Sequence, residues 1–310
     1  MAFNQSVLIC DQVAPILQDI LKKNGLKITY EPEITPDQIK QKIANFEIVI
    51  VRSRTKLTKD IIEKANKCEI IARVGVGLDN IDENAAKEKG IRVINATEGA
   101  MNAVAELVLG LMLSLAREIP RADREIRNGN WLKKELVGTE LSGKYLGIVG
   151  LGNIGKKLAK HARALNMNII GYDVIPIPDE FVREVGLIKT DLDTLISSSD
   201  YVSFHVPFTS ETHHLVNSQR LAKMKKTAYL INTSRGEIID EDALFTALKE
   251  GKIAGAALDV FEKEPATGNK LATLPNVICT PHIGAQTKEA QNLAANVIAE
   301  KIIMILRGVI

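Results

Sequence analysis

Short apolar runs rich in β-branched residues alternate with segments of helical period in the N-terminal third of the chain. Alternation of this kind is typical of a parallel sheet with helices on its faces. The runs expected to form strands are Val7–Cys10, Lys27–Tyr30, Ile48–Val51, Ile70–Val74 and Ile91–Asn95.

The pattern then changes to a long helical stretch, Ala100–Arg117, followed by a charged segment that reaches Lys134 and holds the only tryptophan, Trp131. A second series of apolar runs follows, each apolar on both faces, as strands covered by helices require. These runs are Tyr145–Gly150, Asn168–Asp173, Tyr201–Val206, Ala228–Asn232, Ala254–Val260 and Val277–Thr280. After Pro281 the chain ends in a helical segment, Lys288–Leu306, which we expect to return to the N-terminal domain.

With 310 residues the chain is long enough for two cores. We therefore expect an α/β protein of two doubly wound parallel-sheet domains, of the Rossmann and flavodoxin-like kind, with a cleft between them. Residues 1–98, completed by 286–310, form one domain in this interpretation, and residues 99–285 form the other.

Composition excludes several partners. The net charge is only +2 and aromatic residues make up 4% of the chain, so neither nucleic acid nor a membrane surface is expected to bind. The N-terminus lacks a secretory pattern, and the apolar stretch Leu107–Ala116 is too short to span a bilayer. Cys10, Cys68 and Cys279 are odd in number and lack metal-ligand spacing, which indicates reduced thiols in a cytoplasmic protein without a metal site.

A glycine fingerprint follows the first strand of the second series. Gly150, Gly152 and Gly155 lie between this strand and a helical segment, where they permit a tight turn, close approach of a pyrophosphate and close helix packing. The next strand ends at Asp173, whose carboxylate is placed to bind ribose hydroxyls and to repel a 2′-phosphate. These features predict a dinucleotide site that prefers NAD to NADP.

Three further segments each begin at or just beyond a predicted strand: I-N-T-S-R-G-E with Arg235, G-A-A-L-D-V-F-E-K-E-P with Glu264, and P-H-I-G-A with His282. Carboxyl ends of parallel strands face the ligand crevice, so the three side chains are expected to converge. A histidine can take a proton from a hydroxyl, a glutamate can orient it, and an arginine can bind a carboxylate. This set suits the oxidation of a small 2-hydroxy acid.

The joint placement of these segments resembles the D-isomer-specific 2-hydroxyacid dehydrogenase family, as do V-R-S at Val51–Ser53 and G-V-G-L-D-N at Gly75–Asn80. The resemblance covers nearly the whole chain. It implies that Arg235, Glu264 and His282 are catalytic. It also implies an NAD site lined by Gly150, Gly152, Asn153, Ile154, Gly155, Asp173, His205, Val206, Pro207, Thr233, Ser234, Asp259, Gly284 and Ala285.

His205 stands in F-H-V-P, which matches the wall that the family places beside the cofactor. It is a second candidate for the proton carrier, although its position after a buried strand favours a lining role. His161, His213 and His214 lie in no comparable motif and are expected to be surface or packing residues.

The third strand runs into Arg52-Ser53-Arg54-Thr55-Lys56, a cluster of cations and hydroxyls that favours a phosphorylated substrate. We expect Arg52 and Ser53 to bind the phosphate, with backbone N–H groups of Gly75 and Val76 and the side chain of Arg235 at the carboxylate. Arg54 and Lys56 can equally be solvated loop charges. The predicted reaction is oxidation of 3-phospho-D-glycerate, the first step of serine biosynthesis.

Two alternatives stay open. A glyoxylate or hydroxypyruvate reductase would share the fold and the catalytic set, and an NAD-sensing corepressor-like binding protein could retain the same residues without turnover.

The helical and charged segment 100–134, with Trp131, resembles the arm through which family members dimerise, so a homodimer is expected. The chain ends at Ile310 soon after its last helix, unlike longer members that carry C-terminal regulatory domains. Regulation through such a domain is not expected.

Overall fold

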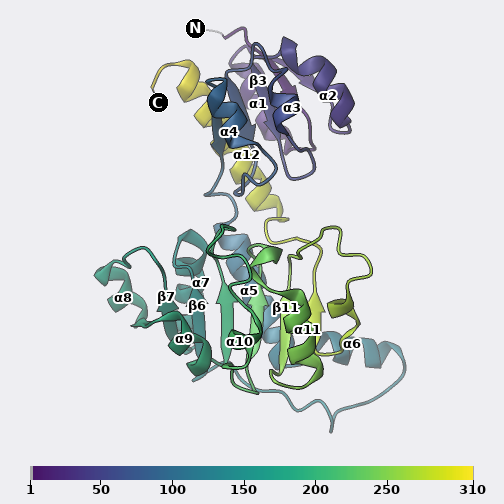
Figure 1. Ribbon diagram of the computed structural model, residues 1–310, viewed down its shortest axis with the longest axis vertical. Helices are drawn as coiled ribbons and strands as arrows, with labels where there is room; N and C mark the ends of the chain where they lie inside the picture. The colour runs from purple at the N-terminus through teal and green to yellow at the C-terminus, as the bar shows by residue number, and fades with distance from the viewer. Residues whose placement is uncertain (1–2, 310) are drawn as a thin grey trace. The chain divides into compact units, whose positions relative to one another are not determined.

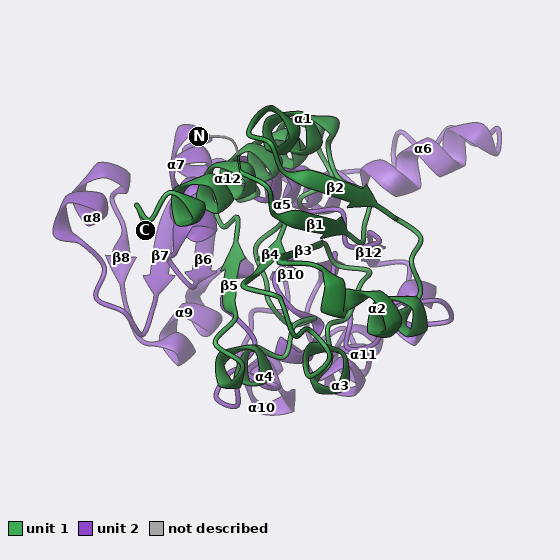
Figure 2. Cartoon of the chain, turned by 90° about the horizontal axis from the view of Figure 1, so that it is seen from above, with its two compact units in different colours: residues 1–101, 285–310 green, residues 102–284 purple. Residues whose placement is uncertain are grey.

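The computed structural model describes residues 3–309 and divides into two compact units. Unit 1 contains residues 1–101 and 285–310, and unit 2 contains residues 102–284 (Figure 2). Each unit holds one sheet whose strands are all parallel. The expected fold class, two parallel sheets flanked by helices, is confirmed.

Unit 1 has five strands in the spatial order β2-β1-β3-β4-β5 (Figure 2). The strands are β1 (Ser6–Ile9), β2 (Lys27–Tyr30), β3 (Ile48–Val51), β4 (Ile70–Arg73) and β5 (Arg92–Asn95). The helices, labelled in Figure 1, are α1 (Pro15–Lys23), α2 (Pro36–Lys42), α3 (Lys59–Ile62), α4 (Glu83–Glu88) and α12 (Lys288–Leu306), with a 3-10 turn at Ile43–Asn45.

The helices of unit 1 lie on both faces of its sheet. Thr287 is the N-cap of α12, and its side chain accepts a hydrogen bond from the Ala290 N–H. The apolar side of α12 joins α1 in a core with β1, β3 and β4. A second core on the opposite face contains apolar residues of α2, α3 and α4. The returning C-terminal helix therefore completes the first domain, although it comes last in sequence.

Unit 2 has seven strands in the order β12-β11-β10-β9-β6-β7-β8. They are β6 (Tyr145–Val149), β7 (Asn168–Tyr172), β8 (Ile188–Lys189), β9 (Tyr201–Phe204), β10 (Tyr229–Asn232), β11 (Gly255–Leu258) and β12 (Val277–Cys279). The helices are α5 (Met101–Ala116), α6 (Ile119–Arg127), α7 (Asn153–Ala164), α8 (Asp179–Val185), α9 (Leu192–Ser198), α10 (Ser218–Leu221) and α11 (Glu241–Lys249), with 3-10 turns at Gly236–Ile238 and Lys270–Thr273.

Several predicted strand ends were wrong by one or two residues. The run Tyr201–Val206 forms a strand only as far as Phe204, which pairs with Asn232 at the last rung of the ladder. Beyond it, apolar character continues into a loop that contains Pro207, which cannot donate to a ladder. Strand β8 was not predicted, because two residues are too few to show a period.

Candidate active site

The strand order of unit 2 creates a reversal point between β6 and β9. From β6 the chain proceeds through β7 to β8 in one direction, and from β9 through β12 in the other. The carboxyl ends of all these parallel strands lie at one edge, where open α/β sheets bind ligands. The predicted cofactor and catalytic residues from Gly150 to Gly284 follow these ends, and Ala285 is the first residue of the last unit 1 segment.

The loop after β6 has the geometry of a dinucleotide turn. Gly150 has a φ of 93°, and a Cβ there would lie 2.6 Å from the carbonyl oxygen of His205, so only glycine fits. A Cβ at Gly155 would lie 2.0 Å from the Gly150 carbonyl oxygen, which explains the close approach of α7 to its strand. Gly152 is the N-cap of α7 and faces open space, leaving the first N–H groups of the helix available to a phosphate.

Asp173 follows β7 and supports this loop. Its Oδ2 accepts the N–H of Leu151 at 2.6 Å, and its Oδ1 accepts the N–H of Ile175 at 2.9 Å. It also lines a cavity of about 560 Å³ formed by residues 171–179 with Lys189 and Thr190. Val174 and Ile175 expose 84% and 70% of their surface there, which provides an apolar wall beside a carboxylate. Such a site suits an adenosine group.

The loop after β10 carries Thr233 and Ser234. The buried Asn232 side chain organises it, because its Oδ1 accepts from both the N–H and the hydroxyl of Ser234 while its Nδ2 donates to the Arg235 carbonyl at 2.8 Å. The Thr233 Oγ1 is buried and has no hydrogen-bond partner in the part of the chain that the structure describes. A buried hydroxyl without a partner costs free energy, so this atom fits a polar group of a bound cofactor.

His205 directly follows β9, one of the two strands that border the reversal point. Its backbone N–H donates to the Val149 carbonyl at 2.8 Å, and its Nε2 lies 2.9 Å from the Ser203 hydroxyl. Burial lowers the pKa of His205 to about 4. The imidazole is therefore neutral at physiological pH, which favours a lining role beside Val206 and Pro207 over proton transfer.

The loops after β11 and β12 are joined through Asp259. This buried carboxylate accepts hydrogen bonds from the Thr280 hydroxyl at 2.6 Å, the Ile283 N–H at 2.8 Å and the Gly284 N–H at 2.8 Å. The His282 N–H donates to the Asp259 carbonyl at 2.9 Å, and His282 adopts a left-handed φ of 51°. Asp259 thus fixes the backbone on both sides of the histidine.

Glu264 and His282 form the pair that the sequence suggested. The Nδ1 of His282 lies 2.9 Å from Oε2 and 3.1 Å from Oε1 of Glu264, and Oε1 also accepts the N–H of Phe261 at 3.2 Å. Both side chains are partly exposed, at 48% and 39%. The carboxylate orients the ring through Nδ1, so that Nε2 is the nitrogen available for proton exchange.

Arg235 lies on the adjacent loop, after β10. Its Nη1 donates to the Ser234 carbonyl at 2.6 Å. The next residue, Gly236, packs so closely that a Cβ would lie 1.9 Å from the Phe261 carbonyl carbon and 2.3 Å from the Glu262 nitrogen. A glycine is therefore required for the Arg235 loop to pack on the loop that carries Glu264.

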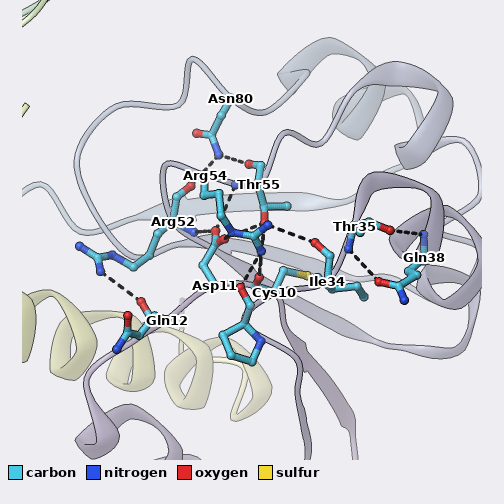
Figure 3. Close-up of polar contacts among 11 residues, drawn as sticks. Cys10, Asp11, Gln12, Ile34, Thr35, Gln38, Arg52, Arg54, Thr55 and Asn80 are labelled. Atoms are coloured by element: carbon cyan, nitrogen blue, oxygen red, sulfur yellow. Dashed lines mark hydrogen bonds and ion pairs between the residues drawn. The ribbon is translucent and has the colours of Figure 1, made fainter. Parts of the chain in front are cut away.

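The sheet of unit 1 has its own reversal point, between β1 and β3, since β2 lies beyond β1 and β4 beyond β3. Arg52 and Ser53 directly follow β3 at this edge. The Arg52 guanidinium makes one hydrogen bond within residues 3–309, from Nη1 to the Gln12 carbonyl at 3.1 Å, and forms no ion pair there (Figure 3). An arginine whose donors remain largely unused at such an edge suits an anionic ligand.

Two other residues of this expected anion site serve the fold instead. Arg54 forms an ion pair with Asp11, Nε to Oδ1 at 3.0 Å, and donates to three backbone carbonyls, so it is a structural residue. The Gly75 N–H donates to the Arg73 carbonyl at 2.9 Å, which closes a tight turn. Because this N–H is used within the fold, Val76 is the residue of the pair that we carry forward as a candidate for the substrate carboxylate.

Sequence reasoning missed Asp11, Asn232 and Thr280. Each lies just after a strand or at its last residue, and each is a short polar side chain next to an apolar run. Their position at the ligand edge was a usable signal. Their partners were not predictable, because these lie on loops distant in sequence.

Within residues 3–309, no helix has both the length and the apolar composition needed to cross a membrane. The same residues contain no group of three or more histidine, cysteine or acidic side chains placed to hold a metal ion. The three cysteines are unpaired.

A doubly wound sheet with a glycine turn, a strand-end aspartate and an unpartnered threonine hydroxyl defines a dinucleotide-binding α/β protein. Residues 109–284 match the model of the D-isomer specific 2-hydroxyacid dehydrogenase NAD-binding domain. The chain belongs to this family, and unit 2 carries its NAD-binding domain.

Relatives cover most of the chain. It is 46% identical over 303 residues to a D-3-phosphoglycerate dehydrogenase of Methanocaldococcus jannaschii, covering 97% of this chain and 57% of that protein. It is also 46% identical over 288 residues to a hydroxypyruvate reductase of Thermotoga maritima, covering 92% of each. The chain thus spans little more than half the length of the phosphoglycerate dehydrogenase.

Among solved structures, the D-lactate dehydrogenase of Aquifex aeolicus, complexed with NAD and lactic acid, has a TM-score of 0.84. Its sequence is 32% identical to this chain, and the match covers 98% of this chain and 96% of that one.

Proposed function

We propose that the protein oxidises 3-phospho-D-glycerate to 3-phosphohydroxypyruvate, with NAD as the hydride acceptor. The observation that carries this proposal is the His282–Glu264 hydrogen bond, 2.9 Å long, at the ligand edge of the NAD-binding domain. The family membership supports the reaction class, and the relatives named D-3-phosphoglycerate dehydrogenase support the substrate.

Unit 2 would hold the cofactor through features already described. The α7 N-terminus with Gly152, Asn153 and Ile154 suits the pyrophosphate, Asp173 the adenosine ribose, and Thr233 a polar group deeper in the site. Val206, Pro207 and Ser234 complete the proposed lining. NAD, when bound, supplies the acceptor for the hydride that leaves C2 of the substrate.

His282 acts as the base in this proposal. Because Glu264 occupies Nδ1, the substrate hydroxyl would give its proton to Nε2, and the carboxylate would stabilise the imidazolium that forms. Arg235 would bind the substrate carboxylate in a bidentate manner. In the reverse direction the protonated His282 would return the proton to the carbonyl oxygen.

In unit 1, we propose that Arg52 binds the substrate phosphate. Ser53 and the backbone of Val76 would make further contacts with the substrate. Arg52 retains unused guanidinium donors at the β1/β3 edge. An unphosphorylated hydroxy acid would leave most donors of this partly buried cation unused, whereas a phosphate would satisfy several of them.

A second candidate function is that of a hydroxypyruvate reductase. The Thermotoga maritima relative supports it, since the match extends over 92% of both chains. The same catalytic residues would act in both reactions, and the two candidate substrates differ in whether they carry a phosphate. An NAD-sensing binding protein is a third possibility that any substrate turnover would exclude.

The test is NADH formation by the purified protein with 3-phosphoglycerate, glycerate and D-lactate in parallel, and NADH consumption with hydroxypyruvate. We expect the highest kcat/KM with 3-phosphoglycerate among the three alcohols. Equal activity on glycerate would overturn the substrate assignment, and no turnover of any compound would overturn the enzyme assignment.

We also propose a cytoplasmic homodimer that uses the 100–134 segment. Helix α6 buries none of its residues, Ile119 and Ile126 are exposed, and Trp131 is 78% exposed. Exposed apolar and aromatic groups on one arm are typical of an interface with a second copy. Sedimentation at micromolar concentration should give a dimer that Trp131→Ala weakens, and a wild-type monomer would contradict the proposal.

A further inference from the structure

We propose that Asp11 is a positioning residue for substrate phosphate, acting through the loop Arg52–Thr55 that follows β3. It would hold this loop in the conformation that presents the Arg52 guanidinium. This inference rests on the proposed function, because it presumes that Arg52 binds a phosphate. The relevant groups are shown in Figure 3.

Asp11 follows β1 at the reversal point of the unit 1 sheet and is only 2% exposed. Its Oδ2 accepts the N–H of Arg52 and, at 3.4 Å, the N–H of Thr55. Its Oδ1 accepts the Thr55 hydroxyl at 2.7 Å. One buried carboxylate thus holds the first and the last residue of the loop.

Arg54 pairs with this carboxylate and holds it in place. Its Nε lies 3.0 Å from Asp11 Oδ1, and its Nη2 donates to the Cys10 and Pro32 carbonyls at 2.6 and 2.7 Å. Its Nη1 donates to the Ile34 carbonyl at 3.2 Å. Arg54 therefore connects the loops that follow β1, β2 and β3, and most of its donors are used within the fold.

Asn80 holds the same loop by its carbonyl groups. Its Nδ2 donates to the Arg52 carbonyl at 2.7 Å and to the Thr55 carbonyl at 2.6 Å. At Arg52 and Thr55, both the N–H and the carbonyl group are therefore occupied by the side chains of Asp11 and Asn80. The backbone is fixed, while the Arg52 side chain makes a single hydrogen bond with Gln12.

A preorganised anion site requires both features, a fixed backbone and a side chain with donors available to the anion. A rigid backbone reduces the conformational entropy that is lost on binding, and a guanidinium with unused donors provides the contact with the anion. Burial lowers the pKa of Arg52, and a bound anion would compensate for the lost solvation of the guanidinium charge. Asp11 contacts the loop and not the phosphate in this proposal, and it is ion-paired with Arg54.

The experiment compares Asp11→Asn and Asn80→Ala with the control Glu47→Gln. Glu47 is a matched carboxylate because it accepts the N–H and hydroxyl of Ser6 and connects β1 to β3 at the opposite, amino edge of the sheet. For each variant, KM and kcat are measured with 3-phosphoglycerate and with glycerate, and folding is checked by circular dichroism and thermal unfolding.

We expect Asp11→Asn and Asn80→Ala to raise KM for 3-phosphoglycerate roughly tenfold, as loss of loop hydrogen bonds implies. Their kcat, and their kcat/KM for glycerate, should stay within about twofold of wild type. Glu47→Gln should change neither KM for 3-phosphoglycerate nor kcat/KM for glycerate. Combined with Arg52→Ala, Asp11→Asn should add almost nothing, since both act on the same contact.

Several outcomes would overturn the inference. Equal losses with both substrates would show a general structural role, and a lower KM in Asp11→Asn would show that its charge matters more than its position. If Asp11→Asn does not fold, Asn80→Ala decides, because it changes no charge. If Arg52→Ala abolishes the phosphate preference while both loop variants retain it, only this inference fails. If the wild type shows no preference, the proposed substrate fails and this inference fails with it.

Discussion

The Nδ1 of His282 lies 2.9 Å from Oε2 of Glu264, and the two residues come from loops after neighbouring strands, β12 and β11. A neutral glutamine can still accept from Nδ1 but cannot stabilise the imidazolium. Glu264→Gln should therefore lower kcat roughly 10- to 100-fold while the NAD dissociation constant stays within about threefold.

The matched control for that variant is Glu262→Gln, because Glu262 contacts a different histidine, His214, at 2.9 Å. It should leave kcat within about threefold. Steady-state kinetics give kcat, and calorimetric titration with NAD gives its dissociation constant. Equal loss of kcat in the two variants would contradict a specific role for Glu264.

The contact between the Arg235 and Glu264 loops predicts a second result. Because a Cβ at Gly236 would lie 1.9 Å from the Phe261 carbonyl carbon, Gly236→Ala should force the loops apart and lower kcat at least tenfold. Gly110 lies within α5 with no atom near its Cβ position, so Gly110→Ala should retain activity and raise the free energy of unfolding by roughly 0.5–1 kcal/mol. Normal kcat in Gly236→Ala would show that this packing does not position the site.

His205 predicts a dependence of stability on pH. Its pKa is lowered from 6.5 to about 4 in the folded chain, so between these values the unfolded chain binds a proton that the folded chain does not. The free energy of unfolding should therefore fall as pH falls through this range. From pH 7 to pH 5 the loss from this residue is about 1–2 kcal/mol.

His205→Asn should remove that part of the pH dependence, as measured by urea unfolding at pH 7 and pH 5. The control is His161→Asn, which replaces a partly exposed histidine of α7. An unchanged difference in the free energy of unfolding between the two pH values in His205→Asn would refute the lowered pKa of His205.

The position of Asp173 leads us to expect a preference for NAD over NADP. Its carboxylate holds the Leu151 N–H at 2.6 Å and borders the 560 Å³ cavity, where it would repel a 2′-phosphate. Asp173→Ala should raise KM for NAD about tenfold and increase relative use of NADP by at least as much. Asp179→Ala, which alters the wall of the same cavity, should leave the preference intact. A preference that Asp173→Ala does not change would remove this role.

The residues that could be predicted from the sequence are those whose geometry is local or shared by all parallel sheets. The glycine turn after β6 is a local feature, so its position and its helix followed directly from Gly150, Gly152 and Gly155. Glu264 and His282 needed one further rule, that parallel strands end at one edge, and β11 and β12 do pair in parallel.

What the sequence did not predict depends on strand order and on long-range partners. Alternation of strands and helices does not say that β1 lies between β2 and β3, and the contact of Asp11 with the Arg52 loop depends on that neighbourhood. For the same reason the sequence left open whether Arg54 was a solvated loop charge. In the structure Arg54 binds Asp11 and three carbonyls, while Arg52 keeps most of its donors unused.

The most direct test of the account follows a hydride. The protein is incubated with NAD and 3-phosphoglycerate deuterated at C2, and the reduced cofactor is analysed by mass spectrometry and NMR, for wild type and for His282→Ala. We predict that wild type transfers the deuterium to the nicotinamide, and that His282→Ala binds NAD normally but transfers the label at least 100-fold more slowly. Reduced cofactor without deuterium, or transfer by His282→Ala at the wild-type rate, would contradict the account.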